Sequence, residues 1–153
     1  MITDPLLDAT PLLARLDAAQ RARVAGTGRE VRLEPGRRLF DEGRPAVGCW
    51  IVCDGSVALD VQVPGRGTVV VQTLGAGDVV GWSWLVPPHR WQLGAVVTAD
   101  TRAWEFDTER LRELTDRDPA LGYALALGVA ETVLHRLYAT RARLLDLYRS
   151  DRE

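Results

Sequence analysis

A short segment, residues 81–92, gathers the side chains of this sequence that are best suited to bind a ligand. It reads GWSWLVPPHRWQ and places three tryptophans, Trp82, Trp84 and Trp91, within ten residues. An indole ring can stack on a purine or another flat ligand, and it can equally fill a protein core, because it is large and mostly apolar. Two interpretations are therefore open: an aromatic clamp for a flat ligand, or a packed plug.

The same segment holds one guanidinium, Arg90, and one hydroxyl, Ser83. A guanidinium forms charge-assisted hydrogen bonds with an anion, and Ser83 and the backbone amides after Gly81 would assist it. The alternative is that Arg90 stacks on a neighbouring tryptophan and faces the solvent. The candidate ligand-binding residues are Gly81, Trp82, Ser83, Trp84, Arg90, Trp91 and Gln92.

The sequence offers no pattern for catalysis or for metal binding. His89 and His135 stand apart, with no cysteine or carboxylate at metal-ligand spacing. No nucleophile elbow, P-loop or dinucleotide-binding glycine pattern occurs. On a strand, Cys49 and Cys53 would lie about 13 Å apart, too far for a disulfide. We expect no enzyme activity, no metal site, no firmly implied cofactor, and buried free thiols.

Short strands must position this segment. Apolar and polar residues alternate over much of 29–106, and glycine-containing turns recur about every ten residues. Asp54-Gly55 predicts a tight hairpin, and strands are expected at about 93–99 and 103–106. The pattern predicts a mainly β fold with flanking helices: a double-stranded, jelly-roll-like β-roll of about eight strands.

Helical segments flank these strands. Residues 1–28 are expected to hold short helices, one of them opened by a capping box from Asp17 to Gln20. Asp107 is a candidate N-cap after the strands, and Asp118-Pro119 opens a second, long helix. We expect one domain over 1–153, with N-terminal helices at 1–28, the β-roll at 29–106 and C-terminal helices at 107–150.

The last helix carries an apolar seam that is longer than the roll can cover. From residue 120, the seam residues recur at alternating steps of three and four, the spacing of a coiled coil. A helix of about 30 residues is about 45 Å long, so we expect part of the seam to pack on a second copy of the chain. The predicted dimer-interface residues are Tyr123, Leu127, Leu134, Leu137, Arg141, Leu144 and Tyr148.

Composition narrows the classes of partner. The 153 residues are 46% hydrophobic and 26% charged, close to the globular average. A net charge of −2 provides no basic excess for nucleic acid. No apolar run approaches the length that crosses a bilayer, and the N-terminus lacks the cationic start of a signal peptide. We expect a cytoplasmic protein that binds neither a membrane nor nucleic acid directly.

Three glycine-centred motifs resemble those of cyclic nucleotide-binding domains of the Crp/Fnr-like superfamily. They are LEPGRRLFDEG at 33–43, WIVCDGSV at 50–57, and LGAGDVVG at 74–81, which is similar to the segment that leads into the family's phosphate-binding cassette. The resemblance spans roughly residues 5–148. It implies the β-roll fold, a C-terminal helix that carries the dimer seam, and a sensor role.

The resemblance also implies a cassette in which a Glu binds the ribose 2′-hydroxyl and an Arg pairs with the cyclic phosphate. Here Trp82 occupies the Glu position, and Gln92, Leu93 or Gly94 stands where the Arg is expected. The nearest guanidinium is that of Arg90. The helix-turn-helix that follows in the family's regulators is not found before residue 153.

These features favour a stand-alone regulatory domain that dimerises through its last helix. We expect it to respond to a cyclic nucleotide such as cyclic AMP, or to another small anionic effector, held by Gly81–Ser83, Arg90–Gln92 and the last helix. One alternative is a ligand-free scaffold that binds a protein partner, with its pocket sealed by tryptophans. Another is the sensor half of a transcription regulator.

Overall fold

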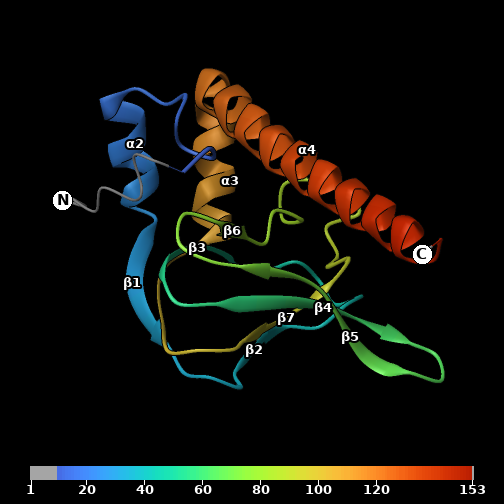
Figure 1. Cartoon of the computed structure of the whole chain (residues 1–153). Helices are drawn as coiled ribbons and strands as arrows, with labels where there is room; N and C mark the ends of the chain where they lie inside the picture. Colours follow the sequence, from blue (N-terminus) through green and yellow to red (C-terminus); the bar gives the residue numbers. More distant parts are fainter. Residues whose placement is uncertain (1–9, 153) are drawn as a thin grey trace.

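Two antiparallel sheets form the centre of the computed structural model, which describes residues 10–152 (Figure 1). One sheet has the strand order β1-β8-β3-β6 and the other β2-β7-β4-β5. The strands are β1 Gly28–Leu33, β2 Arg38–Phe40, β3 Cys49–Asp54, β4 Val57–Val63, β5 Gly67–Leu74, β6 Val79–Val80, β7 Gly94–Val97 and β8 Thr101–Phe106. The predicted β-roll of about eight strands is confirmed.

Three helices flank the strands within the described residues: α2 Ala18–Ala25, α3 Thr108–Arg117 and α4 Pro119–Ser150. The predicted capping box opens α2, because the Asp17 carboxylate accepts from the Gln20 amide at 2.8 Å and the Gln20 side chain accepts from the Asp17 amide at 3.0 Å. Asp107 and Asp118 cap α3 and α4 as predicted. Residues 1–9 of the predicted N-terminal helical segment lie outside the described residues.

The prediction of a hairpin at Asp54-Gly55 is wrong. β3 and β4, which this turn joins, lie in different sheets, so the turn is a corner between them. Gly55 has a φ of +116°, and a Cβ there would lie 2.6 Å from the Cα of Thr101. A corner with this positive φ and no room for a Cβ requires glycine, and a tight hairpin turn requires glycine for its positive φ as well. The local sequence therefore does not distinguish a corner from a hairpin. The hairpin on this part of the chain instead joins β4 to β5.

The buried side chains form two clusters. The inter-sheet core fills the space between the two sheets and contains Leu33, Ala46, Trp50, Val52, Val57, Leu59, Leu74, Val80, Trp91, Ala95, Val97 and Ala103. The helix-facing core lies under the helices and contains Leu12, Leu13, Leu16, Val24, Cys49, Ile51, Val79, Trp84, Phe106, Leu111, Leu121, Ala124, Leu125 and Val129. Neighbouring residues of β3 alternate between the two clusters, as a strand buried on both faces must.

Helix α4 has 32 residues, and only its first third is packed into a core. Its buried residues are Leu121, Ala124, Leu125, Gly128 and Val129. At Gly128 the helix touches the N-terminal segment so closely that a Cβ would lie 2.7 Å from the Cα of Leu12. Beyond that contact, α4 continues across one side of the roll (Figure 1). Most of its side chains there are exposed.

Candidate functional site

The segment 81–92 connects β6 to β7, and two of its tryptophans are core residues. Trp84 is 1% exposed in the helix-facing core, and Trp91 is 4% exposed in the inter-sheet core. The Trp91 ring stacks on Phe40 with their centroids 3.7 Å apart. Gly81 makes room for this ring, because a Cβ there would lie 2.8 Å from it. Their burial in two separate clusters favours the packing interpretation for Trp84 and Trp91.

Trp82 is only half-buried, and a side chain from α4 covers it. The guanidinium carbon of Arg136 lies 4.1 Å from the centroid of the Trp82 ring. Arg136 also donates a hydrogen bond to the carbonyl of Val79, in β6. The position at which the resemblance implies a ribose-binding Glu is therefore filled by an indole in a cation–π contact with the last helix.

The remaining candidate ligand residues lie around the same loop. Arg90 is exposed, and its Nη1 donates to the carbonyl of Gly43 at 2.9 Å. Gln92 is exposed as well and donates to the carbonyl of Arg90 at 3.2 Å, whereas Ser83 is buried. Arg90 is thus bound to the turn after β2, while Trp82 contacts α4. That the seven candidate residues bind a ligand stays a prediction.

Helix α4 bridges the edges of the two sheets through two arginines. β6 ends one sheet and β5 ends the other. Arg136 donates to Val79 in β6, and Arg143 donates from Nη1 to the carbonyl of Val71 in β5 at 2.8 Å. These arginines are seven residues apart, about two turns, and so lie on the same face of the helix.

A cavity of about 300 Å³ lies at this junction of β5, β6 and α4. Its polar lining includes Gln72, Asp78, Thr132, His135 and Arg136. Burial lowers the pKa of Arg136 to about 10, and the nearby Asp78 carboxylate only partly offsets this effect. Arg136 forms no ion pair with a carboxylate of residues 10–152. It is a charged, partly desolvated group without a counter-ion in the described part of the chain.

A second cavity, of about 620 Å³, lies beside the start of α3. Its main polar groups already pair with one another. The indole of Trp50 donates to Glu105 at 2.9 Å, and Arg29 forms an ion pair with the same carboxylate at 3.0 Å. These contacts already use the Arg29 guanidinium and the Glu105 carboxylate.

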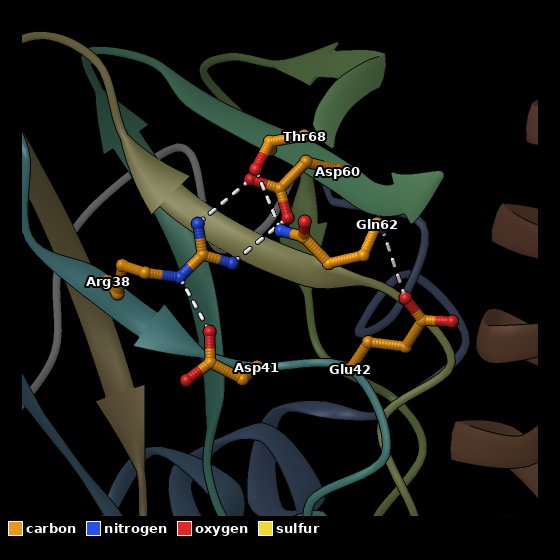
Figure 2. A network of polar contacts seen from close by, with 6 residues as sticks. All are labelled: Arg38, Asp41, Glu42, Asp60, Gln62 and Thr68. Carbon is orange, nitrogen blue, oxygen red and sulfur yellow. Dashed lines mark hydrogen bonds and ion pairs between the residues drawn. The ribbon is translucent and has the colours of Figure 1, made fainter. Parts of the chain in front are cut away.

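Another arginine, Arg38, is more exposed and has a very different set of partners (Figure 2). Its two terminal nitrogens donate to the two oxygens of Asp60, both at 2.9 Å, and its Nε donates to Asp41 at 2.7 Å. The Asp60 carboxylate is 3% exposed. These hydrogen bonds, the one to Asp60 first, raise the pKa of Arg38. The pair joins β2 to β4 beside Gly94, where a Cβ would collide with both charged groups.

Both cysteines are buried thiols, as predicted. Burial raises the pKa of the Cys49 thiol to about 12. Cys49 is therefore protonated at neutral pH and is a core residue, not a nucleophile.

The predicted dimer-interface residues lie on the outward face of α4. Five of them, Tyr123, Leu134, Leu137, Leu144 and Tyr148, are between 42% and 69% exposed, Arg141 is exposed, and Leu127 is half-buried. Because a helix turns about 100° per residue, these residues lie opposite the face that carries Leu125 and Arg136. Tyr138 and Leu145 widen the same stripe and are also exposed. Dimerisation itself stays a prediction.

Sequence reasoning did not assign a role to Arg136 in the site, although a signal was present. Val129, Arg136 and Arg143 repeat at intervals of seven on the face that continues from the buried Leu121 and Leu125. An arginine at a position where the pattern predicts a buried side chain indicates a specific acceptor or ligand.

Metal-binding clusters and membrane-spanning helices are both absent from residues 10–152. No group of three or more His, Cys, Asp or Glu side chains there is arranged to hold a metal ion. In the same range, no helix combines the length and apolar character that a bilayer span requires.

A two-sheet roll, with a loop inserted before its last two strands and a helix across its edges, matches the fold of cyclic nucleotide-binding proteins. The sequence profile of the cyclic nucleotide-binding domain matches residues 30–118. The chain belongs to this family.

Solved structures similar to this chain agree with that assignment. A putative cyclic nucleotide-binding protein from Geobacter metallireducens is 28% identical, with a TM-score of 0.79 over 90% of this chain and 99% of that one. The N-terminal domain of a transcriptional regulator from Streptomyces coelicolor is 25% identical, with a TM-score of 0.70 over 85% and 93%. Catabolite activator protein from Thermus thermophilus, 22% identical with a TM-score of 0.70 over 91% and 63%, shares the fold. No curated protein sequence matched.

Proposed function

We propose that this chain is a non-enzymatic, cytoplasmic regulatory domain whose output element is α4, and that it acts as a homodimer joined through the outward face of that helix. The supporting observation is the exposed stripe of Leu134, Leu137, Leu144 and Tyr148 at coiled-coil spacing. Monomeric proteins rarely expose so continuous an apolar surface. A second copy is the simplest partner, because two identical stripes can pack on each other about a two-fold axis.

Light scattering coupled to size-exclusion chromatography tests the dimer. We expect a mass of about twice the 16.9 kDa of one chain. Replacing Leu134→Asp and Leu137→Asp together should produce a monomer, because charges would be buried in the seam. Val70→Asp is the matched control, since Val70 is 51% exposed but lies on β5. A monomeric wild type at about 100 µM, or a double variant that stays dimeric, would contradict this proposal.

The proposed effector is a small anion, and the cassette supports a mode of binding other than that of ordinary cyclic nucleotides. Trp82 replaces the acid that the resemblance implies for the ribose, and Trp91 fills the inter-sheet core beside the loop. We expect cyclic AMP and cyclic GMP to leave the melting curve unchanged. A ligand at 100 times its dissociation constant would stabilise the fold by about 2.7 kcal/mol. If cyclic AMP instead binds tightly and Arg90→Ala abolishes that binding, then Arg90 is the partner of the cyclic phosphate.

The burial of Trp84 and Trp91 favours one alternative, a scaffold that binds a protein and no effector. In that case the fold would be retained for docking alone. The similarity to the N-terminal domain of a transcriptional regulator supports the other, the sensor half of such a regulator. If an anion binds and changes the exposure of α4, the chain is a sensor, either alone or as half of a transcription regulator. If no anion binds, the scaffold is favoured.

A further inference from the structure

We propose that the cavity between β5, β6 and α4 binds a small organic anion, that Arg136 is its anchor, and that the bound anion holds α4 against the roll. This inference rests on the proposed regulatory function, because it assigns the effector site. It places the anion on a residue of the last helix and not on Arg90 in the loop.

The hydrogen-bonding state of Arg136 carries the argument. A guanidinium has five N–H donors, and in the described structure Arg136 uses them for one hydrogen bond, to the carbonyl of Val79. One face of the group covers the Trp82 ring, which fixes its plane. Arg136 is one of the residues that line the cavity, and it has no ion-pair partner among residues 10–152. A planar fork held in one orientation beside a cavity is suited to a carboxylate or a phosphate.

The rest of the lining describes the molecule that fits. Gln72, Thr132 and His135 add polar groups beside Arg136, and Leu74, Val79 and Ala139 add an apolar wall. Among the described lining residues, Asp78 supplies the one carboxylate. Its Oδ2 accepts from the Gly75 amide at 2.8 Å, and its charge only partly offsets the effect of burial on Arg136. At about 300 Å³ the cavity is at the small end of ligand sites. These features indicate one anionic group on a small apolar body.

The location of the cavity links binding to α4. Thr132, His135, Arg136 and Ala139 belong to the helix, whereas the other lining residues come from the N-terminal segment, β5, and the turn and strand at 77–79. An anion that contacts both sides binds more tightly when the helix is docked than when it is displaced. Such differential affinity is what a ligand needs in order to shift the helix equilibrium.

Titration by ¹H–¹⁵N NMR tests the proposal with phenyl phosphate, benzoate, inorganic phosphate and neutral phenol at constant ionic strength. We expect saturable shifts at the Trp82 indole and at the amides of 77–79 with phenyl phosphate or benzoate, and none with phenol. Arg136→Gln should weaken binding at least tenfold, and Arg136→Lys less. Arg149→Gln, which changes an exposed arginine in the last turn of α4, should stay within twofold of the wild type.

Three outcomes would overturn the proposal. The first is that none of the anions produces a saturable shift. The second is that Arg136→Gln binds them with the affinity of the wild type. The third is that inorganic phosphate binds as tightly as phenyl phosphate, which would show that the ligand needs no organic group. The amide spectrum of each variant shows whether it is folded. Because light scattering measures the dimer separately, loss of this site and failure of the dimer proposal are distinguishable.

Discussion

Two arginines of this molecule connect neighbouring elements of the fold, and they are held in opposite ways. Arg38 lies between β2 and β4 and donates three hydrogen bonds to two carboxylates (Figure 2). Arg136 lies between β6 and α4 and has a carbonyl and an indole face as its partners. The pKa of Arg38 is raised by its acceptors, whereas that of Arg136 is lowered to about 10 by burial.

The difference separates a structural charge from a charge that is available to a ligand. Breaking a buried pair leaves an uncompensated charge, so the Arg38–Asp60 pair fixes the sheet in which it lies. A desolvated cation without a counter-ion reduces stability until an anion reaches it. An anionic ligand would therefore give Arg136 the ion-pair partner that Arg38 already has in Asp60.

The largest predicted loss of stability follows from removing the buried carboxylate that pairs with Arg38. Asp60→Ala should lower the free energy of unfolding by about 2 kcal/mol, less than the loss of a fully buried pair because Arg38 stays in partial contact with water. Asp41→Ala, which removes the exposed partner, should cost well under half as much. Urea denaturation measures both. Equal losses would show that burial of Asp60 does not govern the network.

The corresponding change at Arg136 should have a smaller effect on stability. Arg136→Met removes a hydrogen bond and a cation–π contact, and it also removes the desolvated charge. We expect the free energy of unfolding to change by no more than about 1 kcal/mol. A loss as large as that of Asp60→Ala would mean that Arg136 is a structural group like Arg38, and the comparison would fail.

The smallest expected effect is a difference in pH dependence. Below pH 10 Arg136 is charged in both states, so its penalty is constant. Above a folded pKa of about 10 the folded protein releases the proton first, while the unfolded group keeps it to higher pH. Relative to Arg136→Met, wild-type stability should therefore rise with pH above about 10, by at most about 1.4 kcal/mol per unit. The urea midpoints of both proteins between pH 9 and 11 measure this slope. If the stability of the wild type relative to Arg136→Met falls as the pH rises, the prediction is wrong.

The sequence predicted the parts of the fold that local rules govern. The capping box at Asp17, the caps at Asp107 and Asp118, and the alternating strands each depend on residues close together in the chain. The corner at Gly55 was predicted wrongly, because its sheet assignment depends on which distant strands pair. Trp84 and Trp91 could be interpreted as packing or as clamp residues, since an indole serves both purposes and only tertiary structure separates them.

The candidate site shows the same limit. Arg90 was selected because it lies within the tryptophan segment, but its side chain is bound to the carbonyl of Gly43. Arg136 is more than forty residues further along the chain and reaches Trp82 only because α4 folds back over the sheet edges. The family resemblance indicated the fold, yet it does not point to Arg136, because its motifs end before α4.

A crystal structure of the protein grown with phenyl phosphate tests most directly which guanidinium receives the effector. We expect a phosphate group within hydrogen-bond distance of Arg136, in the cavity bounded by β5 and β6, with Trp82 still beneath the guanidinium. A phosphate bound to Arg90 instead, with the cavity at Arg136 filled by solvent, would contradict this expectation.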